Sequence, residues 1–543
     1  MSMLQAFKPE TAAIRLTDGP DSGDGTDLFL DLQWQGASCD PILRNDGEKP
    51  VRVREVVLFQ GEFPCPAETP LQGESYNMLS QYAGTLASPT DIGDYQSDMR
   101  HYRMPQTPGF FTLYNMLLLQ PEAAPCLLAG FTSSRRFRGE IRLAGVRFEI
   151  VLVLEDRMVP PGATLSLESF SVREGADPES LLAQLASDIN RHHPRLPFEG
   201  PLTGWCSWYC YGPHVTDRII LDNMAAIRQN LPALRYVQID DGYQPAMGDW
   251  LQPNPVLGGS IAALCHDIMY SGFKPAIWVA PFIAEEKSEL LCQHPEWFVQ
   301  SDRGEPLRSD LVTFGGWRQG PWYMLDGTHP GAQAYLTRVF RTMRQEWGCH
   351  YFKLDAIMWG AIPAGIRHDP QATSIEAYRM GMRAILEGAG EGAFVLGCNA
   401  PMWPSLGLVH GMRIGNDIVR NWRSISSVSR QCLLRGWQHG RLWINDPDVI
   451  VLESLPEEQL AADGTAVAAD CATSDEFRFH IATILASGGM VLSGDRMPTL
   501  QESSWRTLGK LLSARRPAAV FSDSRLRTGF CEVNGTPVLI GLN

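Results

Sequence analysis

Long apolar runs are missing from this sequence of 543 residues. No stretch approaches the roughly 18 uninterrupted apolar residues that a membrane-spanning helix requires, so the sequence predicts no membrane partner. The first residues, MSMLQAFKPETAAIRL, contain neither an apolar core nor a small-residue cleavage site, and therefore predict no secretory signal. We expect a cytoplasmic protein.

Positive charge is also scarce. The chain has 46 Lys and Arg against 61 Asp and Glu, which gives a formal net charge of −15. Nucleic-acid binding relies on Lys and Arg that contact phosphates. This composition therefore argues against a nucleic-acid partner.

Motifs for metals and nucleotides are absent as well. Cys206 and Cys210 have no matching Cys or His pair at zinc-binding spacing, and HExxH does not occur. The chain contains no GxGxxG after a predicted strand and no GxxxxGK[ST]. Its 12 cysteines are scattered and often lie in apolar segments, which is typical of reduced, buried thiols. The sequence thus predicts no metal and no cofactor.

Residues 1–174 consist of short segments rich in β-branched and aromatic residues, separated by Gly, Pro, Asn and Asp. Strands at regular spacing without long helices between them predict an antiparallel β-sandwich. The expected strands are Leu28–Trp34, Val51–Phe59, Phe111–Leu119, Cys126–Phe131, Val146–Leu154 and Thr164–Val172. A helix over Pro178–Asn190, with Asp177 as its N-cap, and a proline-rich connector complete a first domain at 1–198.

The pattern after the connector changes to apolar strands that alternate with helix-like stretches. Eight such strands over about 300 residues predict a closed (β/α)8 barrel of the TIM type at 199–505, and an open doubly wound sheet is the alternative. The expected strands are Gly204–Tyr209, Tyr236–Ile239, Pro275–Ala280, Tyr351–Leu354, Phe394–Gly397, Met412–Ile414, Leu442–Ile444 and Met490–Leu492. Residues 506–543 form a short β segment that either packs on the barrel or is part of an incomplete C-terminal domain.

The residues at the carboxyl ends of these strands are acidic, aromatic and amide-rich. In a (β/α)8 barrel this end carries the active site. No histidine occurs among these positions, which disfavours serine and cysteine hydrolases because their nucleophile needs a base beside it. Paired carboxylates with aromatic residues instead suit glycoside hydrolysis. In YFKLD, Lys353 and Asp355 lie two residues apart and therefore share one face of a strand.

Seven motifs occur in order over residues 204–448 and carry a family resemblance. They are GWCSWYCYG, YVQIDDGYQ, GFKPAIWVAPF followed by HPEWFV, YFKLDAI, LGCNAP, GMRIGND and LWINDPD. Together they resemble the melibiase-type α-galactosidases, glycoside hydrolase family 36 and its clan relatives. The resemblance implies an exo-acting enzyme that hydrolyses terminal α-galactosides of oligosaccharides with retention of configuration.

The resemblance also implies roles for individual residues. Asp355 is expected to be the nucleophile, with the charge of Lys353 nearby to favour its ionised form, and Asp417 is expected to be the acid/base. Arg413 lies close to Asp417 in the chain and would oppose protonation of that acid unless its charge points at the sugar. The expected substrate-binding residues are Trp208, Asp240, Asp241, Trp278, Lys353, Cys398, Asn399 and Arg413.

Some alternatives stay open. Asn399 differs from the acidic residue that some clan relatives have at this place, so a 2-acetamido sugar competes with a 2-hydroxyl sugar. An α-N-acetylgalactosaminidase or a raffinose-synthase-like galactosyl transferase would use the same two aspartates, and a carbohydrate-binding barrel without activity is the non-enzymatic alternative. Asp446 and Asp448 are expected to be structural. Homo-oligomerisation stays open.

Overall fold

A computed structural model describes residues 2–8, 11–17, 27–93, 104, 106–199, 202–313, 315–316, 320–455, 471–512, 517–521, 526–533 and 535–542. The chain forms two compact units. The first comprises Met1–Arg195 with Ala361–Arg379 and Pro401–Gly407, and the second comprises Leu196–Gly360, Met380–Ala400 and Leu408–Asn543. The limits 1–198, 199–505 and 506–543 stay predictions.

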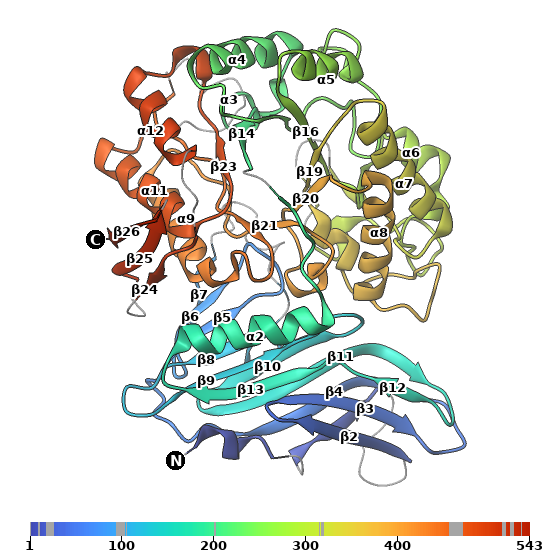
Figure 1. The fold of residues 1–543 in the computed structure, drawn as a ribbon. Coiled ribbons are helices and arrows are strands. Elements are labelled where there is room, and N and C mark those ends of the chain that lie inside the picture. The colour runs from blue at the N-terminus through green and yellow to red at the C-terminus, as the bar shows by residue number, and fades with distance from the viewer. Residues whose placement is uncertain are drawn as a thin grey trace. The chain divides into compact units, whose positions relative to one another are not determined.

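The first unit is built on antiparallel strands, as predicted (Figure 1). Its main path runs β1-β4-β11-β10-β8-β9-β13-β3-β12, with β2 paired to β3 and with β5, β6 and β7 continuing from β8. The strands are β1 (Ala13–Leu16), β2 (Leu28–Gln35), β3 (Ser38–Asn45), β4 (Val51–Glu62), β5 (Pro70–Glu74), β6 (Tyr82–Thr85), β7 (Pro89–Asp91), β8 (Phe111–Leu119), β9 (Cys126–Phe131), β10 (Arg138–Ala144), β11 (Arg147–Val159), β12 (Thr164–Ser166) and β13 (Phe170–Gly175).

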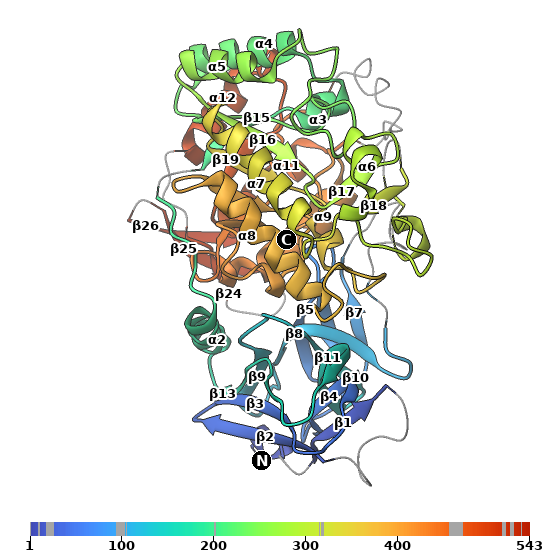
Figure 2. The same ribbon diagram turned by 90° about the vertical axis from the view of Figure 1, so that its right-hand side faces the viewer.

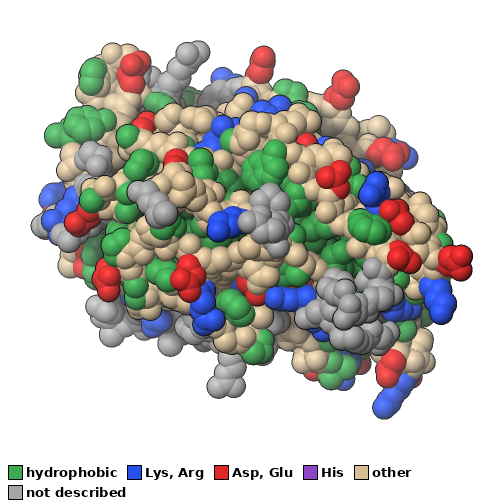
Figure 3. Space-filling model, turned by 90° about the horizontal axis from the view of Figure 1, so that it is seen from below, with side chains coloured by type: hydrophobic (Ala, Val, Ile, Leu, Met, Phe, Trp, Pro, Cys, Tyr) green, Lys and Arg blue, Asp and Glu red, His purple; other side chains and the backbone are tan. Residues whose placement is uncertain are grey.

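Aromatic packing and one helix stabilise this unit. Phe63 and Phe148 stack with ring centroids 4.3 Å apart in its core. Helix α2 (Pro178–His192) begins at the predicted residue because the Asp177 side chain accepts hydrogen bonds from the first free N–H groups. An ion pair of 2.6 Å between Arg173 and Asp188 ties the helix to β13. On the face shown in Figure 3, acidic and basic side chains are interspersed among uncharged ones.

The second unit contains the predicted eight-stranded parallel barrel. Its strand order is β22-β21-β20-β19-β16-β15-β14-β23, and the helices lie outside the strands (Figure 1). Every residue of β15, β19 and β20 is buried, as expected for strands covered on both faces. The strands are β14 (Thr203–Cys206), β15 (Tyr236–Ile239), β16 (Lys274–Val279), β19 (Tyr351–Leu354), β20 (Phe394–Gly397), β21 (Gly411–Arg413), β22 (Ile444–Asp446) and β23 (Val491–Ser493).

Backbone hydrogen bonds complete the barrel where β22 meets β23. The N–H of Met490 donates to the carbonyl of Asn445 at 2.9 Å, and the N–H of Ile450 donates to the carbonyl of Leu492 at 2.8 Å. Gly489 has φ +79°, and a Cβ at this position would lie inside the contact distance of the same Asn445 carbonyl oxygen. A glycine is therefore required at this closure.

Gly489→Ala is expected to lower the free energy of unfolding by about 3 kcal/mol or more, because backbone strain and a steric clash add. Urea denaturation of the whole chain measures this loss. Gly440 is a matched control, since its φ is +71° and a Cβ there would meet nothing within 4 Å. Gly440→Ala should cost only about 1 kcal/mol of strain. Equal losses in the two variants would contradict the role of the Asn445 contact.

Capped amphipathic helices surround the barrel strands. In α11, Thr473 and Glu476 form a reciprocal capping box, and the side chains of Thr216, Ser260 and Asn421 cap three other helices. Figure 2 shows α7 and α8 side by side. The helices are α3 (Trp208–Tyr211), α4 (Asp217–Asn230), α5 (Ile261–Tyr270), α6 (Glu289–Gln293), α7 (Pro330–Gln345), α8 (Ser374–Ala389), α9 (Trp422–Leu434), α11 (Ser474–Ser487) and α12 (Glu502–Leu512).

Two small sheets accompany the barrel. The pair β17 (Ile283–Glu285) and β18 (Trp322–Met324) is an unpredicted antiparallel insertion between β16 and β19. The C-terminal sheet contains β24 (Val520–Phe521), β25 (Thr528–Val533) and β26 (Thr536–Gly541). Ala519, directly before β24, and Ile540 of β26 share an apolar cluster with Leu433 of α9 and Ala486 of α11, so this sheet packs on barrel helices. None of the helices in the described part of the chain is long and apolar enough to cross a membrane.

Candidate active site

Four barrel strands deliver charged side chains to one end of the barrel. Asp240 follows β15, Asp355 follows β19, Arg413 ends β21 and Asp446 ends β22. The barrel strands are parallel, so all these carboxyl ends lie at the same rim. Short buried strands that terminate in polar residues therefore create the acidic rim that the sequence predicts.

Asp355 is held by three N–H donors and is 8% exposed. The indole N–H of Trp278 donates to its Oδ2 at 3.0 Å, and the side-chain amide of Asn399 donates to its Oδ1 at 2.7 Å. The backbone N–H of Ala356 also donates to Oδ1 at 2.7 Å. Ala356 and Asn399 both have positive φ, 51° and 42°, so the backbone is strained where it presents these groups. The structure thus joins Asp355, Trp278 and Asn399, all of which the sequence predicts as site residues.

Lys353 forms its ion pair with Asp240 rather than with its neighbour on the strand. The Nζ–Oδ2 distance is 3.0 Å, and the two side chains are 4% and 3% exposed. Burial by itself would lower the pKa of Lys353, but the charge of Asp240 outweighs burial and the pKa is raised well above its usual value. Gln238 donates to the same oxygen of Asp240 at 2.6 Å. The Lys353–Asp240 ion pair is therefore held in one orientation at the rim, and water has little access to it.

Asp241 and Trp208 lie shortly after the ends of β15 and β14. Asp241 is 1% exposed and accepts a hydrogen bond of 2.7 Å from Gln244. Gly242, directly after it, has φ +117° and allows the turn that brings both carboxylates to the strand end. The predicted strand through Tyr209 is shorter in the structure, where β14 ends at Cys206 and the partly buried Trp208 begins α3.

Arg413 contacts three carboxylates at once. Its guanidinium lies 2.8 Å from Asp417, 3.1 Å from Asp446 and 2.7 Å from Asp448. The side chain of Arg413 is 2% exposed, so this fixed charge is almost completely removed from water. Tyr209 completes the cluster by donating to Asp448 and, at 3.4 Å, to Asp417. The guanidinium of Arg413 is therefore directed at carboxylates, one of which is Asp417.

Asp417 is the most accessible member of this cluster, with 47% of its side chain exposed. Its loop is anchored by Ser424, whose hydroxyl donates to the Asp417 carbonyl at 3.4 Å and accepts from Val419 N–H at 2.8 Å. Arg420 donates to the carbonyls of Tyr209 and Glu453, both at 2.9 Å. A half-exposed carboxylate on an anchored loop can exchange protons with a ligand or with water.

The buried thiol of Cys398 is affected by the charges of several predicted site residues. It directly follows β20, is 1% exposed, and has a pKa raised well above its usual value by burial and next by the charge of Asp355. The charges of Lys353, Arg413 and Asp417 also act on this thiol. After burial, the charge of Asp355 is thus the main cause of the raised pKa of this thiol.

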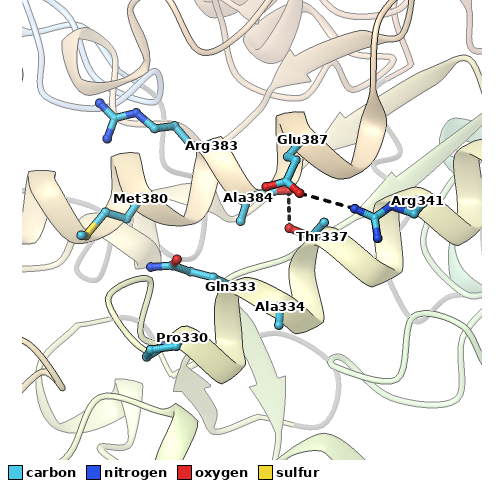
Figure 4. A pocket seen from close by; sticks show the side chains of 9 residues that line it. All are labelled: Pro330, Gln333, Ala334, Thr337, Arg341, Met380, Arg383, Ala384 and Glu387. Atoms are coloured by element: carbon cyan, nitrogen blue, oxygen red, sulfur yellow. Dashed lines mark hydrogen bonds and ion pairs between the residues drawn. The ribbon is translucent and has the colours of Figure 1, made fainter.

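A separate groove lies on the outside of the barrel between α7 and α8 (Figure 4). Its volume is about 520 Å³, and it is lined by Pro330, Gln333, Ala334, Thr337, Arg341, Met380, Arg383, Ala384 and Glu387. Arg341 and Glu387 form an ion pair of 3.4 Å across it. None of the predicted site residues contributes to this lining.

Sequence reasoning missed Tyr209 and assigned Asp446 and Asp448 to structural roles. Tyr209 directly follows Trp208 within GWCSWYCYG, and this position is the signal that could have identified it. Asp446 and Asp448 are two residues apart in NDPD at the end of a strand, so their side chains point to the same face, and this spacing could have indicated that both reach the barrel rim. Across the described ranges, no three His, Cys, Asp or Glu side chains are grouped to hold a metal ion.

Comparisons with known proteins identify relatives of this chain. The Melibiase family model matches residues 235–389. A mouse protein (Mus musculus) named "Myogenesis-regulating glycosidase" is 27% identical over 203 residues, which are 36% of this chain and 27% of the relative. The chain thus spans about a quarter of the length of that curated relative.

Solved structures share the fold over most of the chain. An α-galactosidase from Thermus thermophilus in complex with p-nitrophenyl α-D-galactopyranoside superposes with a TM-score of 0.69 at 21% identity, covering 92% of this chain and 96% of the other. The family 36 α-galactosidase AgaA from Geobacillus stearothermophilus has a TM-score of 0.63 at 11% identity, covering 96% of this chain and 78% of that one. Residues 235–389 thus match the Melibiase family model, and the predicted resemblance to the melibiase-type glycoside hydrolases of family 36 is confirmed.

Proposed function

We propose that this protein is an exo-acting α-galactosidase that hydrolyses terminal α-galactosides with retention of configuration. The setting of Asp355 carries the proposal: the carboxylate lies at the carboxyl end of β19 and accepts hydrogen bonds from Trp278, Asn399 and Ala356. Three N–H donors suit an ionised carboxylate and fix its direction, as a nucleophile requires. The α-galactosidases among the structural neighbours support the choice of sugar.

In the first step, Asp355 attacks the anomeric carbon while Asp417 gives its proton to the departing glycosidic oxygen. Oδ1 of Asp355 accepts two hydrogen bonds and Oδ2 accepts one, so Oδ2 is the oxygen that we expect to form the bond. In the second step, the carboxylate of Asp417 takes a proton from water, and this water releases the sugar from Asp355. Two inversions give net retention, and the 47% exposure of the Asp417 side chain suits both proton transfers.

Sugar recognition is assigned to the residues around these two carboxylates. Asp240 and Asp241 accept hydrogen bonds from the 4- and 6-hydroxyls, and Lys353 lies near the 3- and 4-hydroxyls. The buried ion pair between Lys353 and Asp240 supports this role, because paired side chains are held in one orientation before the sugar enters. Trp208 and Trp278 supply apolar walls for the ring.

Cys398, Asn399 and Arg413 are assigned to the side of the sugar's 2-substituent. The amide of Asn399 donates to Asp355 at 2.7 Å, so Asn399 acts on the nucleophile as well. Arg413 contacts three carboxylates, and its effect on a sugar would therefore be exerted mainly through them.

The proposal predicts that the first product released from an aryl α-galactoside is α-galactose. Proton NMR of the fresh reaction mixture distinguishes the two anomers before they equilibrate. β-Galactose as the first product would contradict a retaining mechanism. A panel of aryl α-glycosides tests the sugar: cleavage of only the 2-acetamido substrate would identify an α-N-acetylgalactosaminidase, and a sugar acceptor that diverts the product from water would identify a transferase.

A further inference from the structure

Arg413 has more negative partners than its single charge requires. Asp417, Asp446 and Asp448 all lie within 3.1 Å of its guanidinium, and the side chain is 2% exposed. Two carboxylates would already exceed its charge. The proposed mechanism uses Asp417, which leaves the other two without a role in the reaction.

The mechanism gives Asp417 a protonation requirement that Arg413 opposes. A general acid must hold a proton when the substrate arrives. A guanidinium 2.8 Å away stabilises the ionised form of the same carboxyl group. Additional negative charge close to Arg413 is needed to offset this effect.

Asp448 lies where it can supply that charge. Its side chain is 0% exposed, lies 2.7 Å from Arg413 and accepts the backbone N–H of Ile418 at 2.7 Å. Its φ is 74°, a conformation that costs energy for a residue other than glycine and that directs the carboxylate into the cluster. Burial raises the pKa of Asp448 to about 7, although the charge of Arg413 opposes the rise, so its negative charge is present on the alkaline side of the profile, where Asp417 must keep its proton.

The groups that face Asp448 come from every element packed around it. They are Arg413 of β21, Asp417 in the following loop, Asp446 of β22, Tyr209 of α3 and Cys432 of α9. Like the Arg413 guanidinium, the Tyr209 hydroxyl donates to both Asp448 and Asp417, the latter at 3.4 Å. The two carboxyl groups therefore share both a cation and a hydroxyl.

We propose that Asp448 is a positioning residue that keeps Asp417 able to hold the catalytic proton, by offsetting the charge of Arg413 and sharing the Tyr209 hydroxyl with it. This inference rests on the proposed function and adds the control of its acid/base. Carboxyl groups coupled in this way titrate as a pair, so one proton held between them serves the reaction. Asp446 has a different role from Asp448. It accepts hydrogen bonds from Arg413 and, at 3.1 Å, from the backbone N–H of Asp448, and so orients the turn that carries Asp448.

The test is Asp448→Asn in the full chain, with kcat/KM measured against pH. For methyl α-galactoside, whose leaving group must be protonated, the alkaline limb of the profile should move to lower pH by roughly 1 pH unit or more, because less negative charge then offsets that of Arg413. Activity at pH 8 then falls about tenfold for each pH unit by which the limb moves, since only the protonated fraction reacts. With α-galactosyl fluoride, whose leaving group needs little protonation, the variant should stay close to the wild type. An unmoved limb in an active variant overturns the inference.

Tyr209→Phe gives a second test, with the opposite sign, that does not depend on folding of the first variant. The hydroxyl donates to both carboxylates and so stabilises the state in which the pair has lost its shared proton; its loss should therefore move the alkaline limb to higher pH. A move to lower pH, or none, contradicts the inference. Suppose instead that Asp448→Asn acted only by weakening the hydrogen bond between Tyr209 and Asp448. Tyr209→Phe removes the same bond, so the alkaline limb would then move in the same direction in Asp448→Asn and Tyr209→Phe.

Asp495→Asn is the matched control for the loss of a buried carboxylate. Asp495 is 2% exposed, and the cation that it pairs with, at 3.3 Å, is Arg420 instead of Arg413. Its variant should keep the wild-type alkaline limb whatever its stability, and a limb that moves as far as that of Asp448→Asn overturns the inference. A wild-type chain that hydrolyses neither substrate overturns the proposed function, and this inference with it. An active wild type with an unmoved Asp448→Asn profile overturns the inference alone.

Discussion

Asp355→Ala is expected to lower kcat for aryl α-galactosides by a factor of roughly 10⁴ or more, because the variant lacks the carboxylate that forms the glycosyl-enzyme. The assay is release of nitrophenol by the purified full-length chain. Trp278 and Asn399 each donate a hydrogen bond to Asp355 and lose their acceptor in this variant. The free energy of unfolding should therefore be measured in parallel, so that inactivity is not confused with loss of structure.

Sodium azide separates the two carboxylates by the configuration of the product. In Asp355→Ala, azide can enter the space of the missing side chain and attack the substrate directly, which gives β-galactosyl azide. Asp417→Ala is the matched variant: the glycosyl-enzyme still forms on Asp355, and azide then attacks from the opposite face to give α-galactosyl azide. The same anomer from both variants would contradict the assignment of nucleophile and acid/base.

Lys353→Met is expected to lower the free energy of unfolding by about 3–5 kcal/mol, because it leaves the carboxylate of Asp240 buried without its cation. Both side chains are under 5% exposed and 3.0 Å apart. Urea denaturation measures the loss. The double variant Lys353→Met, Asp240→Asn should regain most of it, since neither buried charge then remains. A single variant as stable as the wild type would show that the pair contributes little.

A surface pair provides the control for this experiment. Arg218 and Asp222 lie 2.9 Å apart on α4, but their side chains are 81% and 46% exposed. Arg218→Met should change the free energy of unfolding by at most about 1 kcal/mol, because water already screens this pair. A comparable loss in both variants would indicate that the Met side chain, rather than the lost buried charge, destabilises the protein.

The stability that Lys353 contributes should also depend on pH in a defined direction. The charge of Asp240 overcomes the effect of burial and raises the pKa of Lys353 in the folded chain. A raised folded pKa gives stability that is fully present below the unfolded lysine pKa of about 10.4 and is lost as pH rises through the folded value. The difference between wild type and Lys353→Met should therefore stay constant from neutral pH to about pH 10.

Local sequence predicted the strands and the polar residues at their ends. Tyr236–Ile239 and Tyr351–Leu354 have the predicted bounds, because short apolar runs closed by aspartates leave little choice of structure. Strand β25 was missed because TGFCEV mixes Gly, Cys and Glu and has no clear apolar alternation. The pair β17 and β18 was also missed, since strands of three residues give a weak pattern.

The ion-pair partners of the charged residues could not be predicted from local sequence. Lys353 and Asp355 share a strand face, which suggested that they interact, but Lys353 pairs with Asp240 of another strand. In the strand order, β16 separates β15 from β19. Side chains from alternate strands of a closed barrel form one interior layer, and this geometry brings Lys353 to Asp240.

The sequence by itself determined which residue types stand at the ends of the barrel strands, because strand periodicity and the order of the motifs depend only on neighbouring residues. Tertiary structure alone decided that Arg413 is surrounded by Asp417, Asp446 and Asp448, with Tyr209 contributed from a distant part of the chain. Charges act through space, and only closure of the barrel brings residues at or beyond the ends of β14, β21 and β22 within 3.4 Å of one buried guanidinium.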